Sequence, residues 1–215
     1  MKKLSRGPVA ILVCLSVAAA VAGCASFYVK PGVAYHGTRH SYNKVLENWT
    51  REAAIYQGLE TVAMFHATYL SKEFLDAFSR ETARAKNLSQ DQKEKIIARA
   101  MEEHNNSLRF VVALFTSEKH LNDLDSRTSS WGVTLINSDG NRVEPQRIRK
   151  IAGMPYEMRV LYPYIDEWSE IYEIDFPPAL AATQAPTIRE GSGSFTLEIS
   201  GAAGQVDMRW SFEKK

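Results

Sequence analysis

The sequence predicts an α+β protein in which about three helices precede an antiparallel β-sandwich of immunoglobulin-like size. Two observations carry this prediction. From Ser41 to about Asn105, apolar residues recur at the three- and four-residue spacing of a helix face. From Leu108 onward they alternate with polar residues, as they do in strands. We therefore divide the folded body into a helical segment at residues 41–107 and a β-sandwich at residues 108–215.

Three helices are expected in the first segment. The first spans residues 41–58 with Gly58 as its stop, and the second spans about 59–86. The third begins at Ser89, because Ser89 and Gln92 have the spacing of a capping box. The apolar faces of the first two helices are formed by Tyr42, Val45, Leu46, Trp49, Ala53, Tyr56, Val62, Phe65, Tyr69, Leu70, Phe74 and Phe78.

The second segment alternates with a period of two. Strands are expected at residues 108–115, 131–135, 143–151, 156–162, 172–176, 195–199 and 206–212. The Asp139-Gly140 pair marks a turn, and Gly201 to Gly204 closes the last hairpin. Residues 177–193 form the one long irregular connection, and their small and polar composition favours disorder.

The start of the chain has the pattern of a secretory signal. Three basic residues precede an apolar run from Val9 to Ala22, which is shorter than the roughly 20 residues of a spanning helix. Residues 1–23 are therefore expected to be removed. Residues 24–40 lack a clear period and are expected to form a tether with an r.m.s. span of roughly 20 Å.

The end of that signal carries a specific motif. Val21-Ala22-Gly23-Cys24 resembles the lipobox of bacterial lipoproteins. The resemblance implies cleavage before Cys24, lipid on its sulfur and attachment to a membrane of the cell envelope. Each buried methylene contributes about 0.8 kcal/mol, so two or three acyl chains make such attachment effectively permanent. Ala25, rather than Asp, resembles the sorting signal for the periplasmic face of the outer membrane.

The charge and cysteine content of the mature chain narrow the function. Removal of three basic residues with the signal lowers Lys and Arg from 26 to 23 against 25 Asp and Glu, a formal charge of −2. A chain without basic excess is not expected to bind nucleic acid. Cys14 leaves with the signal, so Cys24 has no partner for an internal disulfide.

Local motifs for catalysis, cofactors and metals are missing. The chain has no phosphate-binding glycine loop, no Gly-x-Ser-x-Gly elbow and no His-Glu-x-x-His motif, so neither an enzyme nor a cofactor is expected. His120, Asp123 and Asp125 cluster in one connection, but such groups are common in solvated loops and no metal site is expected. His66 is interpreted as a core or boundary histidine.

One aromatic group is a candidate contact surface. Tyr162, Tyr164 and Trp168 fall at a connection marked by Pro163, where aromatic side chains become partly exposed. Such residues stack on sugars or anchor protein partners. The alternative is that they close one end of the sandwich as part of its core.

These observations predict a non-enzymatic envelope lipoprotein that binds or scaffolds another envelope component through its β-rich part. The alternative is a lipoprotein that binds a carbohydrate or small ligand through the aromatic connection. A hydrolase with a dispersed site is the third possibility. A deep pocket with converging carboxylates or histidines favours an enzyme, whereas a flat patch favours a scaffold.

Overall fold

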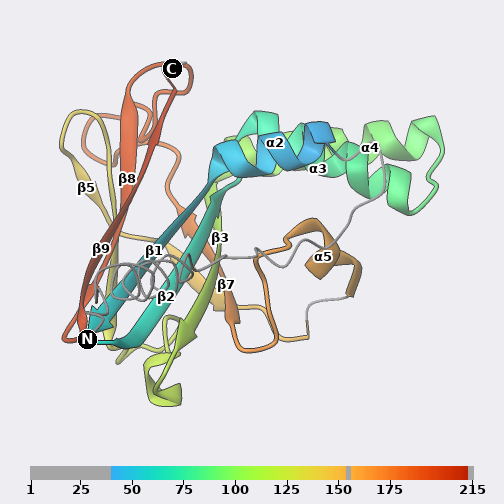
Figure 1. Ribbon diagram of the computed structural model, residues 1–215. Coiled ribbons are helices and arrows are strands. Elements are labelled where there is room, and N and C mark those ends of the chain that lie inside the picture. The colour runs from blue at the N-terminus through green and yellow to red at the C-terminus, as the bar shows by residue number, and fades with distance from the viewer. Residues whose placement is uncertain (1–39, 154–155, 213–215) are drawn as a thin grey trace, which may run out of the picture. The chain divides into compact units, whose positions relative to one another are not determined.

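The computed structural model describes residues 40–153 and 156–212, which combine helices with two antiparallel sheets (Figure 1). The α+β class predicted from the sequence is therefore confirmed. The predicted lipidation site Cys24 and the tether lie outside the described residues. Among the helices of the described part, none is long and apolar enough to cross a membrane.

Nine strands form the two sheets of this part of the chain. Sheet A consists of β1 (Thr50–Gln57), β2 (Glu60–Tyr69), β3 (Leu108–Thr116), β6 (Arg147–Lys150) and β7 (Glu170–Phe176). Sheet B consists of β4 (Trp131–Ile136), β5 (Arg142–Val143), β8 (Ser194–Gly201) and β9 (Gly204–Ser211). The strand orders are β1-β2-β3-β7-β6 and β5-β4-β8-β9. Strand β1 also contacts β9, which joins the two sheets along that edge.

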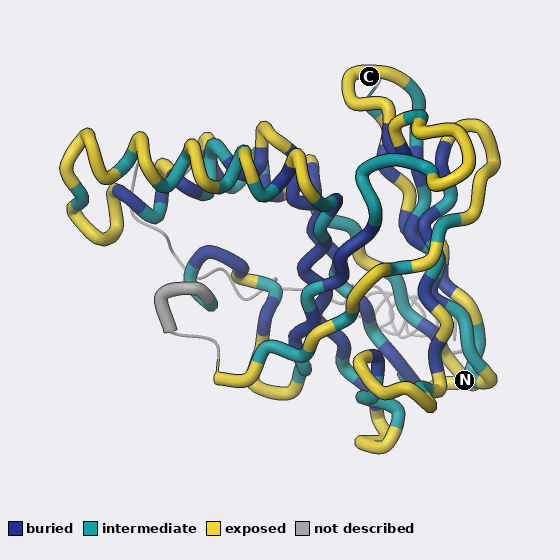
Figure 2. Tube along the Cα trace, turned by 180° about the vertical axis from the view of Figure 1, so that it is seen from behind, coloured by how far each residue is buried: buried dark blue, intermediate teal, exposed yellow. Residues whose placement is uncertain are grey.

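Along the described chain, the helices lie before and between the strands of sheet A. They are α2 (His40–Trp49), α3 (Lys72–Ala85), α4 (Gln90–Asn106), the short 3-10 helix η1 (Lys119–Leu121) and α5 (Tyr156–Leu161). Helices α3 and α4 run side by side as a hairpin that connects β2 to β3 (Figure 1). Figure 2 shows that α4 is largely exposed, and the residue that this helix buries is His104.

Side-chain caps fix where the two long helices begin. The Ser71 hydroxyl accepts a hydrogen bond from the backbone N–H of Phe74 over 3.1 Å and starts α3. The capping box predicted at Ser89 and Gln92 is confirmed. The Ser89 hydroxyl accepts from Gln92 N at 3.3 Å, and the Gln92 side chain accepts from Ser89 N at 2.9 Å. These bonds satisfy N–H groups that the helix itself leaves without partners.

The helical segment predicted at residues 41–107 is wrong where β1 and β2 lie. The first predicted helix ends at Trp49, and Gly58 occupies the tight turn between β1 and β2 with a φ of +63°. This left-handed conformation is one that glycine adopts without steric cost, so Gly58 marks a hairpin rather than a helix end. Sheet A therefore draws strands from both sides of the predicted domain boundary at residue 107.

Strand β2 was not predicted because alanines occupy part of its buried face. Phe65 and Tyr69 are four residues apart, a spacing that fits one face of a helix and also one face of a strand. Ala63 and Ala67 are fully buried on the same strand face, but their small side chains contribute little to a hydrophobic pattern. The two-residue period was therefore present in the sequence, although the helical period fitted its large residues equally well.

Two further predictions are corrected. The strand predicted at residues 156–162 is the helix α5, and the consecutive residues Leu161 and Tyr162 are both buried, which a strand with one buried face does not allow. The connection 177–193 is irregular, as predicted, but it is packed rather than disordered. Ile188 and Thr187 are buried in it, and Thr187 N donates a hydrogen bond to the carbonyl oxygen of Pro178 over 2.9 Å.

The remaining predicted strands are confirmed in place. Residues 108–115, 131–135 and 172–176 lie in β3, β4 and β7, and the last hairpin forms β8 and β9. The irregular strand expected at 143–151 is divided between β5 of one sheet and β6 of the other. The chain thus crosses from sheet B to sheet A at this point.

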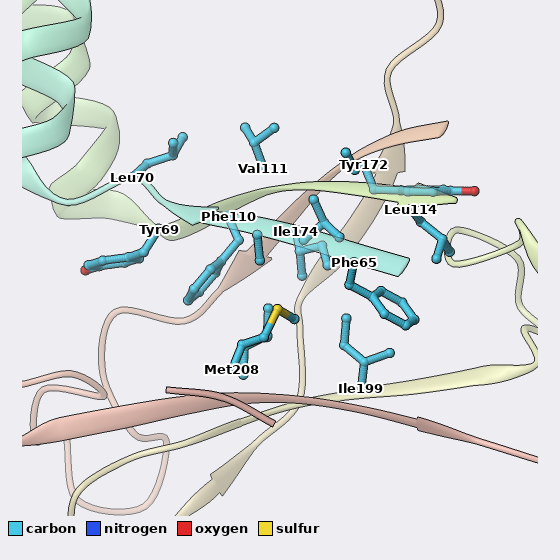
Figure 3. Close-up of a cluster of buried hydrophobic side chains, with 14 of the residues drawn as sticks. Phe65, Tyr69, Leu70, Phe110, Val111, Leu114, Tyr172, Ile174, Ile199 and Met208 are labelled. Carbon is cyan, nitrogen blue, oxygen red and sulfur yellow. The ribbon is translucent and has the colours of Figure 1, made fainter. Parts of the chain in front are cut away.

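The core lies between the two sheets. Figure 3 shows Phe65, Phe110 and Ile174 of sheet A directed toward Met208 and Ile199 of sheet B. All five side chains are at most 1% exposed. Alternate residues of the same strands point the other way, and this outer face of sheet A is the one that the helical hairpin approaches.

Candidate ligand-binding groove

The three aromatic residues proposed as a contact surface have different environments. Tyr162 is 2% exposed and packs on α3, with ring centroids 5.9 Å from Phe74 and 5.5 Å from Phe78. Burial raises the pKa of Tyr162 well above its usual value. The expectation that Tyr162 is partly exposed is wrong, because its ring is a core aromatic, but it also lines the apolar cavity described below.

Tyr164 is a boundary residue. Its ring stacks on His66 with centroids 5.2 Å apart, and its hydroxyl shares a 2.8 Å hydrogen bond with Thr68. His66 lies on β2, where burial lowers the pKa of its imidazole against the opposing effect of Glu52 at 3.5 Å. The interpretation of His66 as a boundary histidine is therefore confirmed, although it lies on a strand rather than a helix.

Trp168 is the member of the group that reaches solvent. Its side chain is 70% exposed. The loop beneath it is held by Asp166, whose Oδ1 accepts hydrogen bonds from Trp168 N at 3.0 Å and from Ser169 N at 2.8 Å. An exposed indole on a fixed backbone is compatible with a contact role.

A larger feature lies under the helical hairpin, between α3, α4 and the outer face of sheet A. It is an apolar cavity of about 330 Å³, within the range of small-molecule sites. Figure 3 shows Leu70 and Val111, two of its wall residues, pointing away from the core of the sandwich. Its other apolar walls include Leu75, Phe78, Ala100 and Ile151.

A polar cavity of about 380 Å³ adjoins the apolar one, because Glu103, Arg109 and Glu173 line both. Its further walls include Arg147 and Asp175. We refer to the two cavities together as the groove, with an apolar compartment and a polar compartment. The groove therefore runs from hydrocarbon-like walls to charged ones.

Paired charges line the polar compartment. Arg109 Nη1 lies 3.0 Å from Glu103 Oε2, and Arg147 Nε donates to Asp175 Oδ2 over 2.7 Å. A third pair, Arg149 and Glu173, joins Nη2 to Oε1 over 3.1 Å. Three arginines thus balance three carboxylates, so the compartment is strongly polar without net charge.

Two buried atoms of this compartment lack hydrogen-bond partners among the described residues. They are Arg109 Nε and Asp175 Oδ1. Arg109 and Asp175 are directly opposite each other in the pairing of β3 with β7, so their side chains share the outer face of the sheet. An unsatisfied buried polar atom costs about 1–3 kcal/mol, so such atoms normally have a partner. A donor and an acceptor without partners therefore belong to opposed residues on this face of the sheet.

A separate cluster fastens the 177–193 connection to the base of the helical hairpin. His104 is 4% exposed, with Nδ1 2.9 Å from Leu70 O and Nε2 2.7 Å from Glu190 Oε1. Lys72 Nζ lies 3.1 Å from Glu190 Oε2. The hydrogen bond from His104, reinforced by Lys72 and opposed by burial, lowers the pKa of Glu190 to about 2. The cluster is interpreted as a structural lock, since the Glu190 carboxylate of the connection is held by both His104 and Lys72 at the base of the hairpin.

Two of the three residues weighed as metal ligands, Asp123 and His120, have other partners. Asp123 accepts hydrogen bonds from Ser129 Oγ at 3.1 Å and from Ser130 N at 2.9 Å, and His120 lies 3.8 Å from Glu118. Across residues 40–153 and 156–212, the structure places no group of three or more His, Cys, Asp or Glu side chains suited to hold a metal ion.

Sequence reasoning missed the groove, although one signal was available. Arg109 interrupts the otherwise apolar run of β3, and Asp175 lies between the buried residues Ile174 and Phe176 of β7. A charged residue in a strand that is covered on both faces needs a partner, and the alternation of the two strands places both on one face. The α3–α4 walls of the groove carried no comparable signal.

Comparison with known proteins adds no functional assignment. No protein-family model matches the chain, and no curated protein matches it. A crystal structure from Burkholderia pseudomallei, described as a novel protein of unknown function, is similar with a TM-score of 0.39 and 10% sequence identity. That match covers 79% of this chain and 81% of the other.

Proposed function

We propose that the protein is a lipid-anchored, non-enzymatic component of the cell envelope that binds a small amphipathic ligand in its groove. The observation that carries the binding role is the junction of an apolar compartment with a charged one on the outer face of sheet A. The lipobox at Val21 to Cys24 supports the anchor. Together these features support a binding protein positioned at a membrane, where amphipathic molecules are abundant.

The pairing of the groove's carboxylates with arginines supports binding rather than acid–base catalysis. A general acid at neutral pH requires a carboxyl group whose pKa is raised. In the groove, the hydrogen bond from Arg99, together with Arg109, lowers the pKa of Glu103. Glu173 and Asp175 are each held by an arginine as well. These carboxylates therefore suit the recognition of a ligand better than proton transfer.

The groove is tested with N-phenyl-1-naphthylamine, an uncharged apolar probe whose fluorescence rises in apolar surroundings. Wild-type protein should bind the probe, and Ala100→Phe, which places a ring in the apolar compartment, should abolish the rise. Ala98→Phe is the matched control, since it makes the same change at an exposed position of α4. Equal binding by all three proteins would remove the groove from consideration.

The anchor is tested independently of the groove. Cys24→Ser should prevent incorporation of labelled lipid and leave an uncleaved precursor or a released form. Wild-type protein that incorporates no label would show that the lipobox resemblance is accidental. A soluble variant that begins after Cys24 should still bind the probe, because the groove is lined by residues from Leu70 onward.

A second candidate function is supported by Trp168. Its exposed indole and the fixed loop around Asp166 form a surface suited to stack on a glycan or to anchor an envelope protein. Tyr164 lies nearby in sequence but is held against His66, so Trp168 carries this candidate alone. Loss of captured material after Trp168→Ala in a crosslinking experiment in intact cells tests it.

A further inference from the structure

We infer that the groove selects a ligand whose polar head is uncharged and both donates and accepts a hydrogen bond, such as an amide or a hydroxyl on a short hydrocarbon chain. This inference rests on the proposed binding function and names the chemical class of its ligand. It depends on three observations: the balance of charges, the two buried atoms without partners, and the size of the apolar compartment.

The charged groups of the polar compartment are already paired. Asp175 is bonded by Arg147 and Glu173 by Arg149, while Glu103 is bonded by both Arg109 and Arg99, the latter from the wall of the apolar compartment. A ligand carboxylate or ammonium entering this compartment must therefore compete with an existing ion pair for its partner. Removing such a charge from water is costly unless it is paired.

The two atoms without partners define the hydrogen bonds that the head makes. Arg109 Nε carries a hydrogen and needs an acceptor, whereas Asp175 Oδ1 needs a donor. A carboxylate satisfies only Arg109, and an ammonium satisfies only Asp175. An amide supplies both an oxygen and an N–H, and a hydroxyl supplies both functions from one oxygen. An uncharged head of this kind is therefore the group that supplies the missing hydrogen bonds of both Arg109 and Asp175.

The apolar compartment accommodates the remainder of the ligand. Its volume of about 330 Å³ is at the lower end of the range for small-molecule sites, so a short chain rather than a long acyl lipid is expected. Leu70 and Val111 are on the same face of sheet A as Arg109, since Arg109 and Val111 are two residues apart on β3. A chain lying on Val111 therefore places its head next to Arg109.

The test is displacement of N-phenyl-1-naphthylamine from the wild-type protein by four compounds with the same chain: octanamide, 1-octanol, octanoate and octylamine. Octanamide or 1-octanol should displace the probe at a concentration at least about tenfold lower than octanoate and octylamine, because only they satisfy both buried atoms. Which of the two is better identifies the head as an amide or a hydroxyl.

A variant then changes the preferred head. Asp175→Asn keeps one oxygen for Arg147 and replaces the acceptor Oδ1 by an N–H₂ donor, so two donors face the head. Octanoate should then displace the probe more readily than octanamide does. Asp207→Asn, at an exposed position of β9, is the matched control and should retain the wild-type order. Thermal unfolding of both variants verifies that they are folded.

The outcomes separate this inference from the proposed function. Probe binding by the wild type with equal displacement by all four compounds would leave the groove intact as an apolar site, but it would overturn the inference, because Arg109 and Asp175 would then not select the head. Stronger displacement by octanoate or octylamine would equally overturn the inference. Absence of probe binding would contradict the proposed function itself.

Discussion

The two faces of sheet A differ in burial and in polarity. On the inner face, Phe65, Phe110 and Ile174 are fully buried against sheet B. On the outer face, Arg109 and Val111 alternate with Phe110 along the same strand but line the groove. Neighbouring residues of one strand thus belong separately to the core and to the groove, because the two-residue period of a strand assigns them to opposite faces.

The core between the inner face of sheet A and sheet B is where a truncation should have the largest effect. Trp210 is 1% exposed, its ring stacks on Phe195 with centroids 5.2 Å apart, and its Nε1 donates to Trp49 O at 2.9 Å. Trp210→Ala should lower the free energy of unfolding by about 3–5 kcal/mol, measured by chemical denaturation. A loss below about 1 kcal/mol would mean that the core between the sheets is not formed as described.

Two alanine-to-phenylalanine variants, one on each side of sheet A, test the same comparison. Ala67 is fully buried on the inner face of β2, so Ala67→Phe should destabilise the protein by about 3 kcal/mol, at the upper end for overpacked cores. Ala100→Phe places the same ring in the groove and should change stability by less than about 1 kcal/mol. Thermal and denaturant unfolding compare the two. Equal costs would show that the groove is as closely packed as the core.

Loss of the Glu190 carboxylate from the structural lock should have a smaller effect on stability, and this effect should depend on pH. The carboxyl group has a folded pKa of about 2 and an unfolded value near 4.5, so its contribution is complete above about pH 4.5 and is lost as the pH falls toward 2. Glu190→Gln should cost about 1–2 kcal/mol at pH 7, after discounting for solvent screening at this partly exposed group. Unfolding measured from pH 7 to pH 2 should show a flatter acid limb for the variant.

A control for the lock is available on the same helix as Lys72. Asp76→Asn removes one partner of the exposed pair Asp76–Arg80, whose Oδ2 and Nε are 2.7 Å apart. Because exposed pairs contribute little, this change should cost less than about 0.5 kcal/mol. An acid limb that is unchanged in Glu190→Gln relative to Asp76→Asn would contradict the interpretation of Glu190, His104 and Lys72 as a lock.

The smallest stability effect is expected at Trp168. Its indole is 70% exposed, so Trp168→Ala should change the free energy of unfolding by less than about 0.5 kcal/mol. Crosslinking should nevertheless recover less partner or glycan if the second candidate function holds. A large drop in the thermal midpoint would instead indicate that Trp168 packs in solution, and unchanged recovery would exclude this surface.

Local signals predicted the parts of the fold that depend on local physics. The Ser89–Gln92 capping box needs only neighbouring residues, and the hairpin of β8 and β9 combines alternation with a glycine turn. Strand β2 depends instead on β1 and β3 on either side, and its Phe65–Tyr69 spacing fitted both periods. Long-range pairing decided between two patterns that the sequence allowed equally.

The candidate site was less predictable than the fold, because its walls come from distant segments. Arg109 and Asp175 are brought together by the register of β3 with β7, and Ala100 reaches the groove through the hairpin of α3 and α4. The charged residue within an apolar strand was the available clue. Tyr162, by contrast, was placed on the surface by its neighbour Pro163, whereas its ring is buried on α3.

The outer edges of the two sheets bear on how copies of the protein tolerate crowding. Long unpaired strand edges allow neighbouring molecules to add strands to one another. Here β5 has two residues and β6 has four, three of them charged as Arg147, Arg149 and Lys150, while β1 is covered by its contact with β9. Among the described strands, none offers a long bare edge. Copies of the protein at high local concentration would therefore resist sheet-to-sheet aggregation.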